Sequence, residues 1–131
     1  MNDAQRDRFD VLMDKAIGEL PTALHDLIRE IPVVVDDRPS ADLVHRLRLP
    51  PGVILCGLHT GIALTNRSVE QSGVPTDVIR LFREGIVRTA GGWRGPHAED
   101  AIYEQIAITL LHEIGHHFGL DEDDLDALGY G

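Results

Sequence analysis

The sequence predicts an α+β domain, in which helices at the two ends of the chain flank a small mixed sheet. Three observations lead to this fold class: amphipathic or apolar helical patterns at residues 3–20 and 97–118, and short β-branched or alternating runs between them. We treat residues 1–131 as a single domain, because this length can bury one core without the help of disulfides.

The first segment, residues 3–20, is expected to form an amphipathic helix, because its apolar side chains recur at helical spacing. Asn2 and Gln5 are placed to form a capping box at its start. Pro21 ends or kinks this helix, and a short second helix follows it. The β-branched run at residues 31–37, closed by the turn residues DDRPS, predicts a strand.

The middle of the chain carries weaker patterns. Residues 41–48 are expected to form a short helical or irregular connection. The stretch 54–68 predicts short strands that are joined by a tight turn at Thr60-Gly61. A small sheet therefore lies between the terminal helices.

Residues 78–90 alternate in polarity, which predicts two strands joined by a hairpin turn at Glu84-Gly85. The longest helix is expected at residues 97–118, with acidic side chains in its first turn and an apolar segment, IAITLL, that favours burial in the core. Gly119 is placed to end this helix.

The composition and charge of the chain exclude some classes of binding partner and indicate a cellular compartment. The chain has 12 basic and 22 acidic side chains, and its formal net charge of −10 excludes nucleic acid and anionic membranes as default partners. The single cysteine, Cys56, excludes an internal disulfide and fits a reducing compartment. No apolar run is long enough to span a bilayer, and the polar N-terminus does not resemble a signal peptide. We therefore expect a cytoplasmic protein.

The chemistry is concentrated at the end of the last helix, which reads His112-Glu113-Ile114-Gly115-His116. Residues four apart project from the same helical face, so His112 and His116 can bind one metal ion. Zinc suits two imidazoles and a carboxylate, with the fourth position left to water. Glu113, beside the first ligand, is placed to take a proton from that water as a general base.

The segment HEIGHHFG resembles the zincin metallopeptidase signature HExxHxxGxx(H/D). Over nearly its whole length, the chain is similar to short bacterial zincin-like proteins, through its leading helix and the segments GLHTGIALTNRS, VIRLFREGIVR and HEIGHHFGLDEDDLDALGY. The resemblance implies a compact zincin-like domain, one Zn²⁺ ion and hydrolysis of a peptide or protein substrate. It leaves a homodimer open.

The third zinc ligand is where the chain departs from that family. The family has an aspartate six residues after the second histidine, and Glu122 stands at this position. A glutamate can also bind zinc, so we favour Glu122 as the third ligand and keep Asp121, one residue earlier, as the alternative.

No methionine follows the motif, so the chain cannot form the methionine turn of metzincins. Tyr130 is the remaining candidate at the site, where its hydroxyl would polarise a substrate carbonyl or hold a ligand. The alternative is a tail tyrosine that packs on the surface.

Two other functions compete with peptide hydrolysis. A zincin scaffold can lose catalysis and serve as a metal-binding or interaction module. The chain also has the helix-and-turn spacing of small zinc endoribonucleases that mature ribosomal RNA. Those enzymes have a glycine after the first histidine and a third histidine ligand. Glu113, an acidic third ligand and the net charge of −10 count against RNA.

Overall fold

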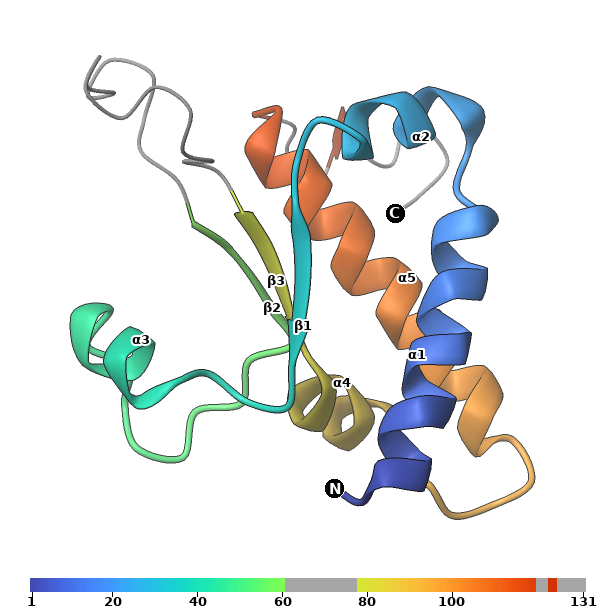
Figure 1. The fold of residues 1–131 in the computed structure, drawn as a ribbon, viewed down its shortest axis with the longest axis vertical. Coiled ribbons are helices and arrows are strands. Elements are labelled where there is room, and N and C mark those ends of the chain that lie inside the picture. Colours follow the sequence, from blue (N-terminus) through green and yellow to red (C-terminus); the bar gives the residue numbers. More distant parts are fainter. Residues whose placement is uncertain (61–77, 120–122, 125–131) are drawn as a thin grey trace.

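The computed structural model of the chain describes residues 1–60, 78–119 and 123–124 (Figure 1). Its elements, in chain order, are α1 (Asp3–Gly18), α2 (Thr22–Ile28), β1 (Val33–Asp36), α3 (Ala41–Arg46), β2 (Gly57–Thr60), β3 (Val78–Phe82), α4 (Arg83–Ala90) and α5 (Ala98–His117). This order confirms the α+β class, with a long helix at each end of the described chain and strands between them.

Helix α1 begins at the predicted capping box. The side chain of Asn2 accepts a hydrogen bond from the Gln5 amide at 2.8 Å, and the Gln5 side chain accepts one from the Asn2 amide at 3.1 Å. These two bonds satisfy amides that the first turn leaves without helical partners. The helix ends at Gly18, shortly before Pro21, as the sequence predicts.

Within the described residues, the sheet has three strands in the order β1-β3-β2. Strand β1 lies parallel to β3, with Val33 opposite Ile79, and β2 lies antiparallel to β3, with Gly57 opposite Leu81. The sheet is therefore small and mixed, as expected. The predicted turn at Thr60-Gly61 and the strand expected after it lie outside the described residues, apart from Thr60 at the end of β2.

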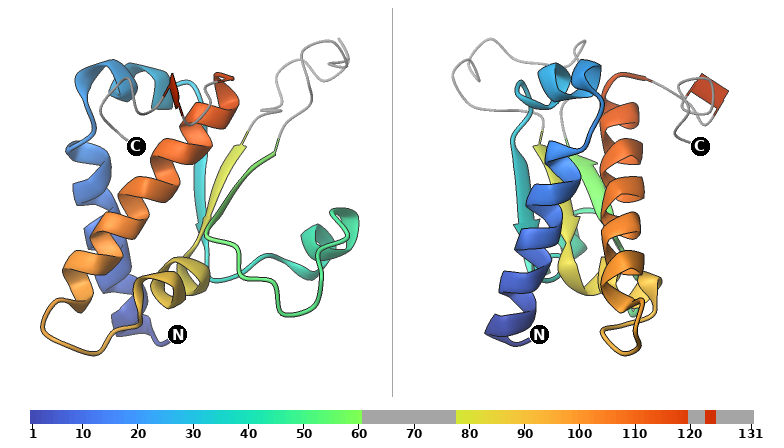
Figure 2. Two further views of the ribbon diagram at one scale, coloured as in Figure 1. Left: turned by 180° about the vertical axis from the view of Figure 1, so that it is seen from behind. Right: turned by 90° about the vertical axis from the view of Figure 1, so that its right-hand side faces the viewer.

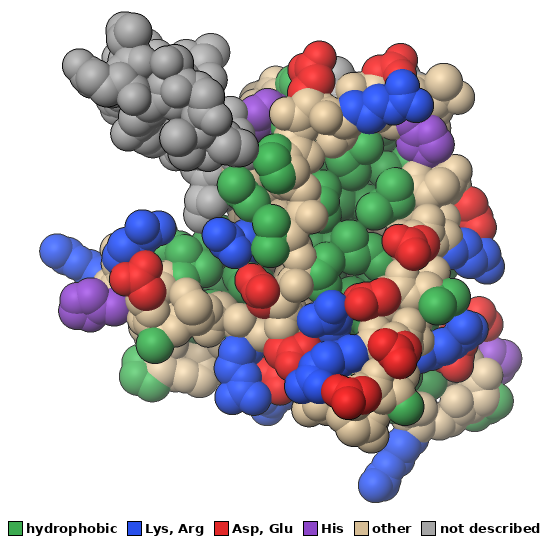
Figure 3. All heavy atoms as spheres, in the orientation of Figure 1, with side chains coloured by type: hydrophobic (Ala, Val, Ile, Leu, Met, Phe, Trp, Pro, Cys, Tyr) green, Lys and Arg blue, Asp and Glu red, His purple; other side chains and the backbone are tan. Residues whose placement is uncertain are grey.

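Helices α1 and α5 pack against one another and cover the same side of the sheet (Figures 1 and 2). Between these layers lies one hydrophobic cluster, which includes Phe9 from α1, Ile79 and Leu81 from β3, and Ile106 and Leu110 from α5. All five side chains are completely buried. Figure 3 shows hydrophobic side chains of this layer between β1 and α1. The core therefore holds α5 directly against the sheet.

Charged side chains surround the end of the molecule where α1 begins and α4 lies (Figure 3). Arg83 donates to both oxygens of Asp10 at 3.0 and 3.1 Å and to Asp37 at 3.1 Å. Arg6 also donates to Asp37, at 2.8 Å. These charge-assisted bonds tie α1 and the end of β1 to the start of α4.

The predicted hairpin at Glu84-Gly85 is wrong, because residues 83–90 form helix α4. Strand β3 runs directly into this helix and takes both of its pairing partners from other parts of the chain. Gly85 is buried at a close approach to another segment, since an added Cβ would lie only 1.8 Å from the carbonyl oxygen of Leu55. A glycine that permits such an approach resembles a turn glycine in sequence.

Helix α5 confirms the predicted last helix to within one residue at each end. Its buried face includes Ile106, Leu110 and Ile114, whereas Ile108 of the IAITLL segment is 42% exposed. Gly119 follows the helix with a φ of 71°, the left-handed conformation that commonly ends a helix. None of the described helices has the length and apolar character needed to cross a membrane.

Candidate metal centre

The residues of the HEIGH motif lie together near the C-terminal end of α5. The ring centroids of His112 and His116 are 6.4 Å apart, and their ring planes meet at 62°. Two imidazoles on one tetrahedral zinc have ring centroids roughly 5 Å apart, given Zn–N bonds of about 2.0–2.1 Å. The observed separation of 6.4 Å is close to this value, and two imidazoles are donors that suit zinc.

Exposure differs sharply among the motif residues. The His116 side chain is 59% exposed, whereas that of Glu113 is only 11% exposed. A Glu113 carboxylate oxygen lies 3.8 Å from Nδ1 of His116. The carboxylate is thus buried beside a histidine that solvent reaches, an arrangement that suits a base acting next to a metal ion.

Strand β2 also packs against Glu113. Gly57, the first residue of β2, lies against α5 so closely that an added Cβ would be 2.7 Å from Cγ2 of Thr109 and 3.1 Å from Cγ of Glu113. It would also lie 3.2 Å from the carbonyl oxygen of Arg80 in β3. Glu113 is therefore packed directly beneath the backbone of an outer strand of the sheet.

No sequence pattern identifies Gly57 or Thr109 as a site residue. Thr109 is 5% exposed, and its hydroxyl accepts a hydrogen bond from the Gln105 side chain at 3.2 Å. The importance of Gly57 depends on a contact with residues more than fifty positions away, and no local pattern reports such a contact. Only the three-dimensional structure identifies this pair.

The other predicted site residues lie outside the part of the chain that the structure describes. Glu122, its alternative Asp121, and Tyr130 all fall in this group. Within the described residues, no group of three His, Cys, Asp or Glu side chains is placed to hold a metal ion. The choice of third ligand and the role of Tyr130 therefore stay predictions.

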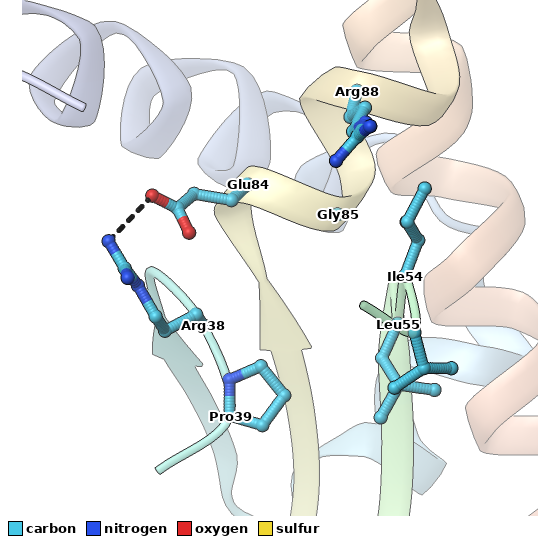
Figure 4. Close-up of a pocket in the computed structure, with 8 residues that line it drawn as sticks. Arg38, Pro39, Ile54, Leu55, Glu84, Gly85 and Arg88 are labelled. Atoms are coloured by element: carbon cyan, nitrogen blue, oxygen red, sulfur yellow. Dashed lines mark hydrogen bonds and ion pairs between the residues drawn. The ribbon is translucent and has the colours of Figure 1, made fainter. Parts of the chain in front are cut away.

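A concavity of about 120 Å³ lies away from the motif, at the start of α4 (Figure 4). Arg38 and Glu84 close one side of it with an ion pair of 3.1 Å, and Leu55 and Gly85 also line it. None of its lining residues belongs to the HEIGH motif. This pocket is separate from the candidate metal centre.

A family model described as zincin-like metallopeptidase matches residues 28–131, a range that includes the sheet, α4 and α5. No curated protein matches the chain. The matched range contains both histidines and Glu113 of the motif.

Proposed function

The chain belongs to the zincin-like metallopeptidase family, and from this premise we propose that it is a zinc-dependent hydrolase of peptide bonds. The observation that carries the proposal is the position of Glu113, buried between a solvent-exposed histidine and the backbone of an outer strand. That position provides a base, a metal-binding side chain and a surface for an extended substrate within one small region.

In the proposed mechanism, His112 and His116 hold the zinc ion, and Glu122 or its alternative Asp121 completes the protein ligands. Zinc, when bound, supplies Lewis-acid polarisation of the scissile carbonyl and makes water a stronger acid. Glu113 accepts a proton from the attacking water and then passes it to the nitrogen of the leaving amine. Its burial keeps bulk water away from the carboxylate and restricts it to this exchange.

Strand β2 supports a peptide as the substrate. In the described part of the chain, β2 pairs with β3 alone, through bonds that include Phe82 N–H to the Cys56 carbonyl at 2.8 Å. Backbone groups alternate in direction along an antiparallel strand, so those of Gly57 and His59 lie along the outer edge. An extended peptide that added to this edge would pass directly by Glu113. RNA has no equivalent backbone for such pairing.

The test is hydrolysis of an unbiased peptide pool, read by mass spectrometry, with zinc-loaded wild type and the Glu113→Gln variant. The amide fills the same space but cannot act as a base, so we expect a rate loss of roughly two to four orders of magnitude with zinc retained. Glu104→Gln is the matched control, since Glu104 is an exposed glutamate on the same helix. Addition of a chelator should abolish cleavage.

Two results would contradict the proposal. If folded, zinc-loaded wild type cleaves no peptide, the chain acts instead as a metal-binding or interaction module. If a parallel RNA pool is cleaved in a chelator-sensitive way and peptides are not, the substrate class is RNA.

A further inference from the structure

Gly57 has no place in the motif, yet it lies at a close approach between the sheet and the motif helix. A Cβ at this position would be within 3.2 Å of three different neighbours: Thr109, Glu113 and the Arg80 carbonyl. Real Cβ atoms essentially never lie within 3.0 Å of another group, and the contact with Thr109 would be 2.7 Å. Only glycine fits at this point without moving β2 or α5.

The Thr109 side chain cannot easily move away from a Cβ at position 57. Its side chain is β-branched, short and stiff, and it is 5% exposed. The hydrogen bond from Gln105 holds its hydroxyl, which leaves its methyl group facing β2. A larger residue at position 57 would therefore push β2 away from α5, and the surface that packs on Glu113 would move with it.

We propose that Gly57 is a positioning residue for Glu113: because it has no side chain, the backbone of β2 packs on the Glu113 Cγ and holds the carboxylate beside the metal-binding histidines. The contact is direct, and through it β2 acts on the rotamer of the general base. The effect on catalysis rests on the proposed function, whereas the contact itself does not.

The first test compares Gly57→Ala with a matched control, Gly18→Ala, in which the added Cβ meets nothing within 4 Å. A displaced base lowers the chemical step, so kcat should fall by about 10- to 100-fold in Gly57→Ala, a larger change than the change in KM that a shifted β2 edge produces. Zinc affinity should stay within about threefold of wild type, because the three atoms nearest to the added Cβ belong to Thr109, Glu113 and Arg80 and not to a histidine. Gly18→Ala should match wild type in all three quantities.

A second-site change separates positioning from general destabilisation. Thr109→Ser removes the methyl group that lies nearest to the added Cβ, so Gly57→Ala/Thr109→Ser should regain most of the kcat that Gly57→Ala loses. Thr109→Ser alone should leave kcat within about twofold of wild type. A double variant that folds, binds zinc and is as slow as Gly57→Ala would overturn the proposal, as would a folded Gly57→Ala with wild-type kcat.

A measurement on the wild type keeps the test independent of activity and of how the variants fold. In the zinc-loaded protein with assigned side chains, nuclear Overhauser spectra should show a cross peak between the Gly57 Hα and Glu113 Hγ protons. Its absence from a complete spectrum would overturn the proposal even if peptides are cleaved. Its presence in a protein that cleaves no peptide would support the contact and contradict only the proposed function.

Discussion

The junction between β3 and α4 gives a prediction whose size follows from the structure. We consider Gly85→Ala, in which the added Cβ would lie 1.8 Å from the Leu55 carbonyl oxygen and 2.6 Å from its carbon (Figure 4). Rotation of a side chain cannot relieve a clash with backbone. The two segments must separate by about 1.6 Å to reach the 3.4 Å of ordinary contact.

Three contributions set the expected change in the free energy of unfolding. Overpacking of this severity costs about 3 kcal/mol, and separation would break the bond from Phe82 N–H to the Cys56 carbonyl, worth about 1 kcal/mol. Alanine offsets about 1 kcal/mol through its better helix propensity. The net loss is about 3 kcal/mol, which lowers the melting temperature by roughly 10 °C in a domain of this size.

The assay is urea and thermal unfolding followed by far-UV circular dichroism, with Gly18→Ala as the control. Gly18 also lies in a helix, but its added Cβ meets open space, so its stability should change by no more than about 0.5 kcal/mol or rise slightly. If Gly85→Ala unfolds within about 0.5 kcal/mol of wild type, α4 does not lie as close to Leu55 as the structure places it.

Two further predictions concern a partly buried ion-pair network and the metal ligands. The hydrogen bond from Arg6 lowers the pKa of Asp37 below its ordinary 3.8, and Arg83 adds to this effect. A lowered carboxyl pKa stabilises the fold above about pH 4, and this stabilisation is lost as pH falls through the lowered value. The free energy of unfolding of wild type should therefore exceed that of Asp37→Asn at pH 7, and this difference should shrink toward pH 3. A difference that does not depend on pH would refute this reasoning. For the metal, Glu122→Ala should weaken zinc affinity at least about tenfold, or ~1.4 kcal/mol, and Asp121→Ala much less, by chelator competition at fixed pH. The reverse order would make Asp121 the ligand.

The sequence predicts the terminal helices well because their signals are local. The capping box at Asn2 and Gln5 and the apolar spacing of α1 depend only on neighbouring residues. The same holds for Gly119, which follows α5 and whose positive φ ends that helix. Such signals act over one or two helical turns, so a single sequence displays them fully.

The middle of the chain is harder, because its structure depends on contacts between distant segments. The alternation at residues 78–82 correctly indicates a strand, but the partners of β3 come from β1 and β2 rather than from an adjoining hairpin. The sequence predicts a turn at Gly85, whereas in the structure this glycine admits the Leu55 backbone. Local sequence cannot distinguish these two uses of glycine.

The candidate site also combines a local feature, which the sequence predicts, with a contact between distant segments, which the sequence does not predict. The four-residue spacing of His112 and His116 follows from helix geometry, and the structure places the two rings 6.4 Å apart. The packing of Gly57 on Glu113 requires β2 to reach α5, and only the tertiary fold shows it. Sequence therefore identifies the chemical groups, and the structure identifies what holds the base in place.

We propose that His112 and His116 bind a zinc ion, and the zinc content of the purified protein measures this binding. The purified wild type, the His112→Ala/His116→Ala double variant and a His97→Ala control should be compared by elemental analysis, with thermal melting to verify folding. His97 is a suitable control because its side chain is 87% exposed and lies at the opposite end of α5. We expect one zinc ion per chain in wild type and His97→Ala and none in the folded double variant, because a single remaining carboxylate cannot hold the ion. Full zinc occupancy in the double variant, or no zinc in folded wild type supplied with the metal, would contradict it.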